Sequence, residues 1–227
     1  MIPWLIDDAT PFPPVEKALH EPNGLLAASD SLTVTRLKKA YSLGIFPWYS
    51  PGEPVLWWSP SPRMVLYTHH FKCHRSLRQI IKKKPFEIRL DTAFETVMKH
   101  CAQAQRPRQH GTWIVQDIIQ AYTALHQQGL AHSVEAWEDD SLVGGLYGVN
   151  IGQMFFGESM FSLRPNASKI ALAHLVDRLS SHGLNLIDCQ QETSHLASLG
   201  ASPISRDLFK QEIHTRIALE TPKTLWL

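Results

Sequence analysis

Apolar side chains recur three or four positions apart in several stretches of this chain. This spacing predicts three amphipathic helices, over Thr33–Leu43, Cys73–Lys84 and Gln116–Gln128. Thr33 is expected to cap the first helix, and Gly44 is expected to end it. Helical segments are therefore predicted on both sides of the chain's midpoint.

Alternation of apolar and polar residues, typical of strands, dominates the middle of the chain. Three runs of this kind lie between Ser133 and Ser162, separated by turn-forming residues at Asp139-Asp140 and Asn150-Ile151-Gly152. Strands joined by such short turns pair in sequence order. The pattern predicts a β-meander.

The last third of the chain alternates helix and strand. Asn166 is expected to cap an amphipathic helix that ends at Gly183, and LNLIDCQ (184–190) predicts a buried strand. Helices are expected around Leu196 and over Arg206–Ile217. A meander followed by helix, strand and helix is an α/β (α+β) order like that of the N-acetyltransferase superfamily, a GNAT-like fold.

Residues 1–62 differ in composition and are expected to form a small N-terminal domain, with 63–227 forming a larger one. The stretch IFPWYSPGEPVLWWSPSPRM (45–64) holds three tryptophans, one tyrosine and five prolines. Proline fixes the backbone angle φ, so it lowers the entropy lost when a neighbouring ring is held in place. This stretch therefore predicts a rigid aromatic surface.

Composition limits the class of protein. The chain has 227 residues, 44% of them hydrophobic, and no apolar run approaches the roughly 20 residues that span a bilayer. The N-terminus lacks the basic region of a secretory signal. The three cysteines, Cys73, Cys101 and Cys189, have no paired spacing, which argues against a disulfide framework and against a four-ligand zinc site. A cytoplasmic protein without a metal is expected.

Charge is distributed unevenly. Residues 63–110 hold eleven Lys or Arg against three acidic residues, a net charge of +8, whereas the rest of the chain carries −7 with histidine neutral. The helix over Cys73–Lys84 would place Arg75, Arg78 and Lys82 on one face, followed by Lys83 and Lys84. A solvated surface helix is one interpretation. Clustered cations favour the other, contact with a nucleic-acid backbone.

Common catalytic motifs are mostly incomplete. GESMF (157–161) begins like a nucleophile elbow but has Phe161 in place of the second glycine. RQHGTW (108–113) begins like the pyrophosphate loop of acetyl-CoA-dependent acyltransferases but has the bulky Trp113 where a small residue is needed. The twelve histidines are scattered and are expected at the surface. A serine hydrolase is therefore not expected.

Seven collinear blocks carry a specific resemblance. They are EPNGLLA (21–27), GIFPWYSPGEPVLWWSPSPR (44–63), GTWI (111–114), VGGLYGV (143–149), FGESMFS (156–162), NASK (166–169) and LIDCQ (186–190). Together they resemble the leucyl/phenylalanyl-tRNA-protein transferases, over nearly the whole chain.

The resemblance implies peptide-bond synthesis without a ribosome. Members of this family move leucine, phenylalanine or, less often, methionine from aminoacyl-tRNA to the α-amino group of proteins that begin with Arg or Lys, and so mark them for the N-degron pathway. The aminoacyl ester is already activated, so no cofactor is expected. The expected partners are aminoacyl-tRNA and acceptor proteins, with no membrane, and the chain is expected to be a monomer.

The same resemblance assigns substrate-binding residues. Trp48 and Trp113 match aromatic residues at the 3′ adenosine of the tRNA, and Tyr41 is expected in the same cleft. Burial in the core is the alternative interpretation for Trp48 and Trp113. For Trp57 and Trp58, burial in the core is the preferred interpretation. Another three residues match the pocket for the aminoacyl side chain: Leu146, Phe155 and Met160. Family members often have methionine in place of Leu146.

Three polar residues are the expected catalytic group. Glu158 and Asp188 lie within apolar β segments, where an unpaired carboxylate is costly to bury. Their partners are expected to be either neighbouring protein groups or the acceptor's cationic N-terminal residue and its amine. Asp188 and Gln190 alternate along a strand and are expected on one face, with Cys189 turned towards the core. The resemblance implies that this pair orients and deprotonates the attacking amine.

Two other function classes remain open. A CoA-dependent N-acetyltransferase would need a complete pyrophosphate loop. A non-catalytic tRNA-binding protein would keep the basic helix but would have no use for the buried acids Glu158 and Asp188.

Overall fold

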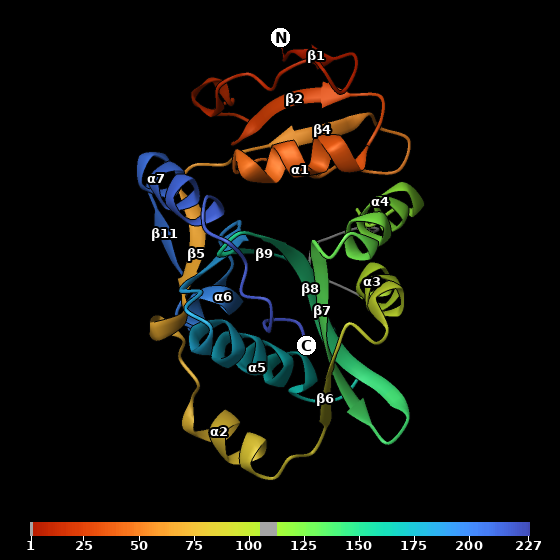
Figure 1. Cartoon of the computed structure of the whole chain (residues 1–227), viewed down its shortest axis with the longest axis vertical. Coiled ribbons are helices and arrows are strands. Elements are labelled where there is room, and N and C mark those ends of the chain that lie inside the picture. Colours follow the sequence, from red (N-terminus) through yellow and green to blue (C-terminus); the bar gives the residue numbers. More distant parts are fainter. Residues whose placement is uncertain (1, 105–112) are drawn as a thin grey trace.

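Two β-sheets organise the molecule, as the computed structural model shows for residues 2–104 and 113–227 (Figure 1). The smaller sheet has the strand order β1-β2-β4-β3, and the larger has the order β11-β5-β10-β9-β8-β7-β6. The mixed α/β class predicted from the sequence is confirmed. The division into domains at residue 62 stays a prediction, although the chain passes from one sheet to the other between β4 and β5.

Strands of both sheets are short except in the meander. The smaller sheet consists of β1 (Trp4–Leu5), β2 (Leu25–Ser29), β3 (Phe46–Pro47) and β4 (Val55–Trp58). The larger sheet consists of β5 (Arg63–Tyr67), β6 (Glu87–Leu90), β7 (Ala131–Glu138), β8 (Ser141–Ile151), β9 (Met154–Ser162), β10 (Leu186–Gln190) and β11 (Ser202–Ile204). The predicted meander corresponds to β7, β8 and β9.

Helices connect these strands. The α-helices are α1 (Val34–Ser42), α2 (Arg75–Lys82), α3 (Phe94–Gln103), α4 (Gln116–Gln127), α5 (Ala167–Ser181), α6 (Ser194–Ser198) and α7 (Arg206–Ile217). Two short 3₁₀ helices are η1 (Val15–Lys17) and η2 (Thr68–His70). All predicted helices are confirmed within a few residues of their ends.

Helix ends follow the predicted chemistry in one case and differ in another. The Thr33 hydroxyl accepts a hydrogen bond from the Arg36 backbone N–H at 3.0 Å, and Gly44 follows α1 with a φ of 73°. Asn166 precedes α5, but its side chain makes no capping hydrogen bond. It instead adopts a left-handed φ of 68°, which asparagine tolerates better than most residues.

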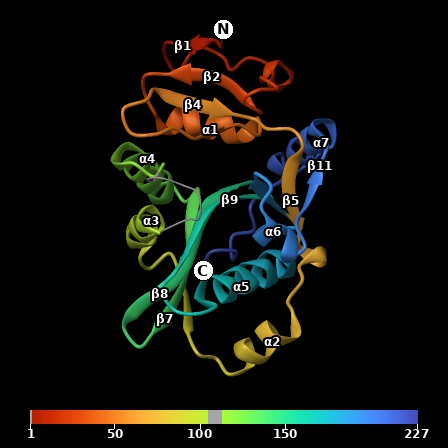
Figure 2. The same cartoon turned by 180° about the vertical axis from the view of Figure 1, so that it is seen from behind.

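Helices cover both faces of the larger sheet (Figure 2). On one face, α3 and α4 pack over an apolar core that includes Phe94, Tyr122 and Phe156. On the other face, α5 packs over a second core that includes Phe155 and Leu175. The central strands therefore contribute alternate side chains to two separate cores.

A β-bulge interrupts this alternation in β9. Tyr147 of β8 pairs with Ser159, whereas the next residue, Gly148, pairs with Gly157. Glu158 is therefore the extra residue of the bulge. Beyond it, the odd and even positions of β9 exchange faces.

The strands β9 and β10 are parallel neighbours for only a short distance. Their register pairs Ile187 with Phe155 and Asp188 with Phe156. The helix α5 provides the crossover between the two strands. The remaining part of β9, from Gly157 onward, lies beyond this pairing, and this is where the site described next is found.

In the described part of the chain, no helix is both long enough and apolar enough to cross a membrane.

Candidate active site

An apolar pocket of about 640 Å³ opens beside β9 and β10. The three residues predicted for the aminoacyl pocket, Leu146, Phe155 and Met160, all line it. Four further large apolar residues of its wall were not predicted from the sequence: Leu172, Leu175, Ile187 and Leu196. Because they come from α5, β10 and α6, their periodicity indicated only an ordinary core.

The β9 bulge is what brings the predicted pocket residues together. Phe155 and Met160 are five positions apart, so a regular strand would direct them to opposite faces. With Glu158 as the extra residue, both face the same core as Leu146, which pairs with Met160 across the sheet. The pocket wall therefore depends on one backbone irregularity.

Glu158 lies among the residues that line the pocket and connects it to a buried polar cluster. Its Oε1 accepts hydrogen bonds from the Tyr41 hydroxyl at 2.6 Å and from the Gln190 Nε2 at 2.7 Å. The Tyr122 hydroxyl lies 3.3 Å from its Oε2 and is also within hydrogen-bond distance of the Tyr41 hydroxyl, so its single proton can serve either partner. Protein hydroxyl and amide groups therefore surround the carboxyl group.

Burial raises the pKa of Glu158 to about 7, and the nearby charge of Asp188 acts in the same direction. Hydrogen bonds from Tyr41, Tyr122 and Gln190 lower this pKa. Burial also raises the pKa of both tyrosines well above the ordinary value, so that they remain donors. Glu158 can therefore exchange a proton near neutral pH.

Asp188 is paired inside the protein. Its Oδ1 and Oδ2 accept hydrogen bonds from Arg63 Nε and Nη2 at 2.8 and 2.7 Å, and both side chains are buried. The guanidinium carbon of Arg63 lies 4.8 Å from the Phe46 ring centre and 4.6 Å from that of Phe209. Of the two alternatives left by the sequence, the structure therefore shows a neighbouring cation as the partner of Asp188.

Gln190 is displaced from the regular strand. The register of β10 shifts between Asp188 and Gln190, and Gln190 has a φ of 62°. Its backbone N–H donates to Asp188 Oδ1 at 2.9 Å, while its side chain donates to Glu158. The expectation of simple alternation was therefore wrong, because the bulge gives the two side chains different partners.

Cys189 packs against the core, as expected. It is half-buried against the cluster that includes Leu146 and Phe155, and it also lines the pocket together with Ile187 and Glu158. Burial raises the pKa of its thiol well above the ordinary value, with the charge of Asp188 as a second cause. The protonated thiol is a weak nucleophile, so Cys189 is a wall residue.

The predicted adenosine-binding residues have different surroundings. Trp48 is 37% exposed and lines a cleft of about 350 Å³ together with Trp58 and Glu192. Trp113 is only 8% exposed and belongs to the core beneath α3 and α4. Tyr41 is buried and faces Glu158. Trp48 is therefore the one of these three with an accessible ring.

The described part of the basic segment, residues 63–104, does not form one continuous cationic surface. Arg63 is buried against Asp188, Arg89 pairs with Glu87, and Lys99 pairs with Glu95. The five cations of the predicted binding helix are all exposed: Arg75, Arg78, Lys82, Lys83 and Lys84. Arg106, Arg108 and the first two residues of the GTWI block lie outside the described residues. Within the described part of the segment, most of the exposed positive charge lies at α2 and directly after it.

Two residues of the polar cluster had no signal in the sequence. Tyr122 occupies an apolar position of α4, where a core role was the simplest interpretation, and it reaches Glu158 across 36 positions. Arg63 was counted only in the net charge of residues 63–110, because its partner lies 125 positions away. Long-range pairs of this kind leave no local pattern.

Among the described residues, no group of three or more His, Cys, Asp or Glu side chains is arranged to hold a metal ion.

An apolar pocket lined by a half-buried carboxyl group, which is itself hydrogen-bonded to an amide, is suited to an enzyme that positions an apolar group beside a proton acceptor. The comparisons with known proteins agree. A family model described as leucyl/phenylalanyl-tRNA protein transferase matches residues 65–214, and a model of the N-terminal domain of the same family matches residues 30–61.

Curated relatives match over the full length of the chain. A leucyl/phenylalanyl-tRNA–protein transferase from Chromobacterium violaceum is 53% identical over 226 residues, which cover 100% of this chain and 96% of the relative. Another from Nitrosomonas europaea is 55% identical over 226 residues, which cover 100% of this chain and 95% of that relative. The chain belongs to the leucyl/phenylalanyl-tRNA-protein transferase family, and the resemblance seen in the sequence is confirmed.

Similarity to solved structures is low. A functionally unknown conserved protein from Staphylococcus epidermidis gives a TM-score of 0.42 at 10% identity, covering 80% of this chain and 68% of that one. L-PGS from Bacillus licheniformis gives a TM-score of 0.36 at 9% identity, covering 83% of this chain and 65% of that one. Scores this low support no functional comparison.

The buried ion pair generates a prediction about stability. Asp188→Ala leaves the Arg63 charge buried without its partner, and breaking such a pair costs about 3–5 kcal/mol of unfolding free energy. The double variant Arg63→Met with Asp188→Leu removes both charges and is expected to be more stable than Asp188→Ala. Urea unfolding of the three proteins measures this difference. A double variant less stable than Asp188→Ala would contradict it.

Proposed function

We propose that this protein transfers leucine, phenylalanine or, less often, methionine from aminoacyl-tRNA to the α-amino group of proteins that begin with Arg or Lys. Membership of the family supports this reaction. The single observation that carries it is the pocket lined by Leu146, Phe155 and Met160, which also includes Glu158. The apolar walls suit the donor side chain, and the carboxyl group suits the attacking amine.

The donor is proposed to bind with its side chain in this pocket and its terminal adenosine on an aromatic ring. Trp48 is the accessible candidate, since its ring is exposed in a cleft braced by Pro60 and Pro62. Stacking of a base on such a ring contributes about 1–3 kcal/mol. Trp113 and Tyr41 are buried, so they are not proposed to stack on the base directly.

The transfer step needs a neutral amine. The acceptor's amine nitrogen attacks the ester carbonyl carbon, a C–N bond forms, and the C–O bond to the ribose breaks. The nitrogen loses a proton, and the ribose oxygen gains one. Glu158 is proposed to accept the first proton, since burial raises its pKa to about 7 and it can be ionised near neutral pH.

Gln190 is proposed to orient the reacting groups and not to act as the base. Its amide Nε2 is bonded to Glu158, which leaves its amide oxygen free to accept a hydrogen bond from the amine. Asp188 would act through position and charge, because it holds the Gln190 backbone and raises the pKa of Glu158. Correct placement of the reacting groups alone can lower the activation free energy by several kcal/mol.

We also propose that the larger domain has a GNAT-like fold. An antiparallel meander, a parallel β9–β10 pair with α5 as its crossover, and a pocket where these strands diverge support this assignment. The finer expectations of the family, namely the N-degron role, a cytoplasmic location and a monomeric state, remain proposals.

Incubating the protein with charged Phe-tRNA and a peptide that begins with Arg tests the reaction. We expect a peptide extended by phenylalanine, detected by mass spectrometry, and no extension of a peptide with a blocked amine. Absence of the product with an active tRNA donor would overturn the proposed function. Acetylation of the peptide by acetyl-CoA would favour an N-acetyltransferase, and tRNA binding without either product would favour a binding protein.

Glu158 gives this reaction a specific pH dependence. Since the carboxylate form increases as pH rises through about 7, single-turnover transfer is expected to rise over the same range. Glu158→Gln should abolish this rising limb of the pH–rate profile, and only the rise due to deprotonation of the acceptor amine, at about pH 8, should remain. Tyr41→Phe removes a hydrogen bond that lowers the pKa of Glu158, so the limb should move to higher pH. A limb unchanged in both variants would exclude Glu158 as the base.

The exposed face of α2 is proposed to contact the tRNA backbone. Changing Arg75, Arg78 and Lys82 together to Gln should weaken tRNA binding and reduce the slope of log affinity against log salt by about 2–3. The matched control replaces three exposed lysines outside α2 with Gln, namely Lys17, Lys38 and Lys223. Equal slopes in the two triple variants would contradict a specific role for α2.

A further inference from the structure

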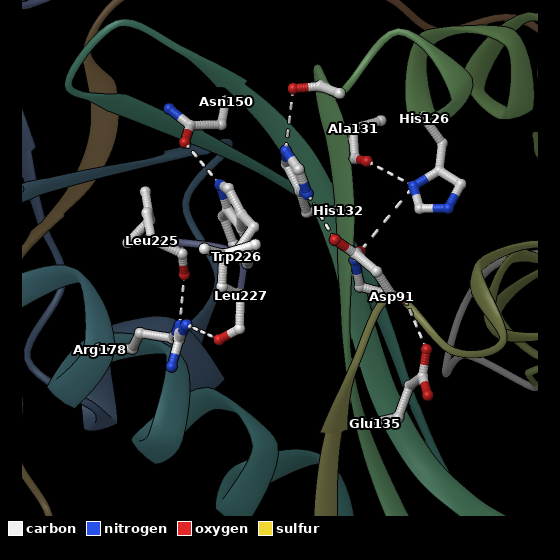
Figure 3. Close-up of polar contacts among 12 residues, drawn as sticks. Asp91, His126, Ala131, His132, Glu135, Asn150, Arg178, Leu225, Trp226 and Leu227 are labelled. Atoms are coloured by element: carbon white, nitrogen blue, oxygen red, sulfur yellow. Dashed lines mark hydrogen bonds and ion pairs between the residues drawn. The ribbon is translucent and has the colours of Figure 1, made fainter. Parts of the chain in front are cut away.

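Residues 221–227, here called the strap, cross the molecule between α5 and the central strands (Figure 3). The Thr221 hydroxyl donates to the Gly152 carbonyl at 2.7 Å. Arg178 of α5 donates to the Thr224 carbonyl at 3.0 Å and also to the carbonyls of Leu225 and Leu227. Hydrogen bonds therefore hold the strap along most of its length.

The strap contributes to the same core as the pocket wall. Leu225 is completely buried in the cluster that includes Leu146 and Phe155. The Trp226 ring lies 5.8 Å from the Phe155 ring, centre to centre, at an angle of 36°. Trp226 is not among the described residues that line the pocket, so it lies behind Phe155 as a second layer.

Trp226 is itself held in a defined position. Its ring stacks on His132 at 4.0 Å with an interplanar angle of 2°, and its Nε1 donates to Asn150 Oδ1 at 2.9 Å. His132 Nδ1 lies 2.7 Å from Asp91 Oδ2, as Figure 3 also shows. His132 is buried, contrary to the expectation that the histidines lie at the surface. This support restricts movement of the indole.

Phe155 also lies against a glycine. A Cβ added to Gly148 would lie 2.6 Å from Phe155 Cζ, so the absence of a side chain there makes room for the ring. Phe155 therefore has both Gly148 and Trp226 as neighbours, and it also lines the pocket. Its position, and so the depth of the pocket, depends on both neighbours.

We infer that Trp226 is a positioning residue that sets the depth of the aminoacyl pocket through Phe155, and thereby the preference among apolar donors. This inference rests on the proposed function, because the pocket is taken to hold the donor side chain. Removing the indole gives Phe155 space to move away from the pocket. A deeper pocket favours the larger phenylalanyl side chain over the leucyl one.

The ratio of kcat/KM for Phe-tRNA to that for Leu-tRNA tests the inference. Trp226→Ala is expected to raise this ratio by about tenfold, the scale at which apolar pockets discriminate side chains. Trp226→Phe keeps a ring stacked on His132 and is expected to stay closer to the unmodified protein. Leu227→Ala is the matched control, since this residue of the strap is 86% exposed and should leave the ratio unchanged.

A purely structural role would lower transfer of both donors equally and leave their ratio within about twofold, which would overturn the inference. Both donors are measured with the same protein preparation. Partial unfolding of Trp226→Ala therefore lowers both kcat/KM values equally and does not change their ratio. If that variant does not fold, Trp226→Leu provides the same comparison, with a ratio shifted in the same direction expected. Failure of the unmodified protein to use either donor would instead overturn the proposed function.

Discussion

One extra residue in β9 is the constraint on which the candidate site depends. Because Glu158 is inserted into the strand as a bulge, Phe155 and Met160 face the same pocket although they are five positions apart. The same irregularity directs the Glu158 carboxyl group towards Tyr41 and Tyr122 on the opposite side of the sheet. An apolar wall and an acid with a pKa of about 7 therefore arise from a single feature of the backbone.

The Arg63–Asp188 pair joins this site to the rest of the molecule. Arg63 begins the first strand after the small sheet, and its guanidinium lies beside Phe46 of that sheet and Phe209 of α7. Asp188 lies where β9 and β10 last pair, and it holds the backbone of Gln190. Buried pairs of this kind are costly to break. The position of Gln190 is thus coupled to the contact between the two sheets.

Periodicity and turn residues were sufficient to predict the helices α1, α4 and α5 and the meander. They did not predict α3 or the strands other than the meander and β10. Among these, β1 and β3 are strands of two residues, which have no period to detect. The resemblance supplied the pocket residues, but neither bulge can be inferred from strict alternation, so Gln190 was misplaced. His132 was expected at the surface and Arg63 was counted only as part of a basic segment, because their partners lie far away in sequence. What the sequence did not provide is mainly the pairing of distant polar groups.

The most direct measurement is a crystal structure with a hydrolysis-resistant donor analogue, phenylalanine joined to adenosine by an amide bond. The account predicts the phenyl ring within about 4 Å of Leu146, Phe155 and Met160, with the amide carbonyl beside Glu158 and Gln190. A phenyl ring bound in the cleft of Trp48, or anywhere else outside this pocket, would contradict it.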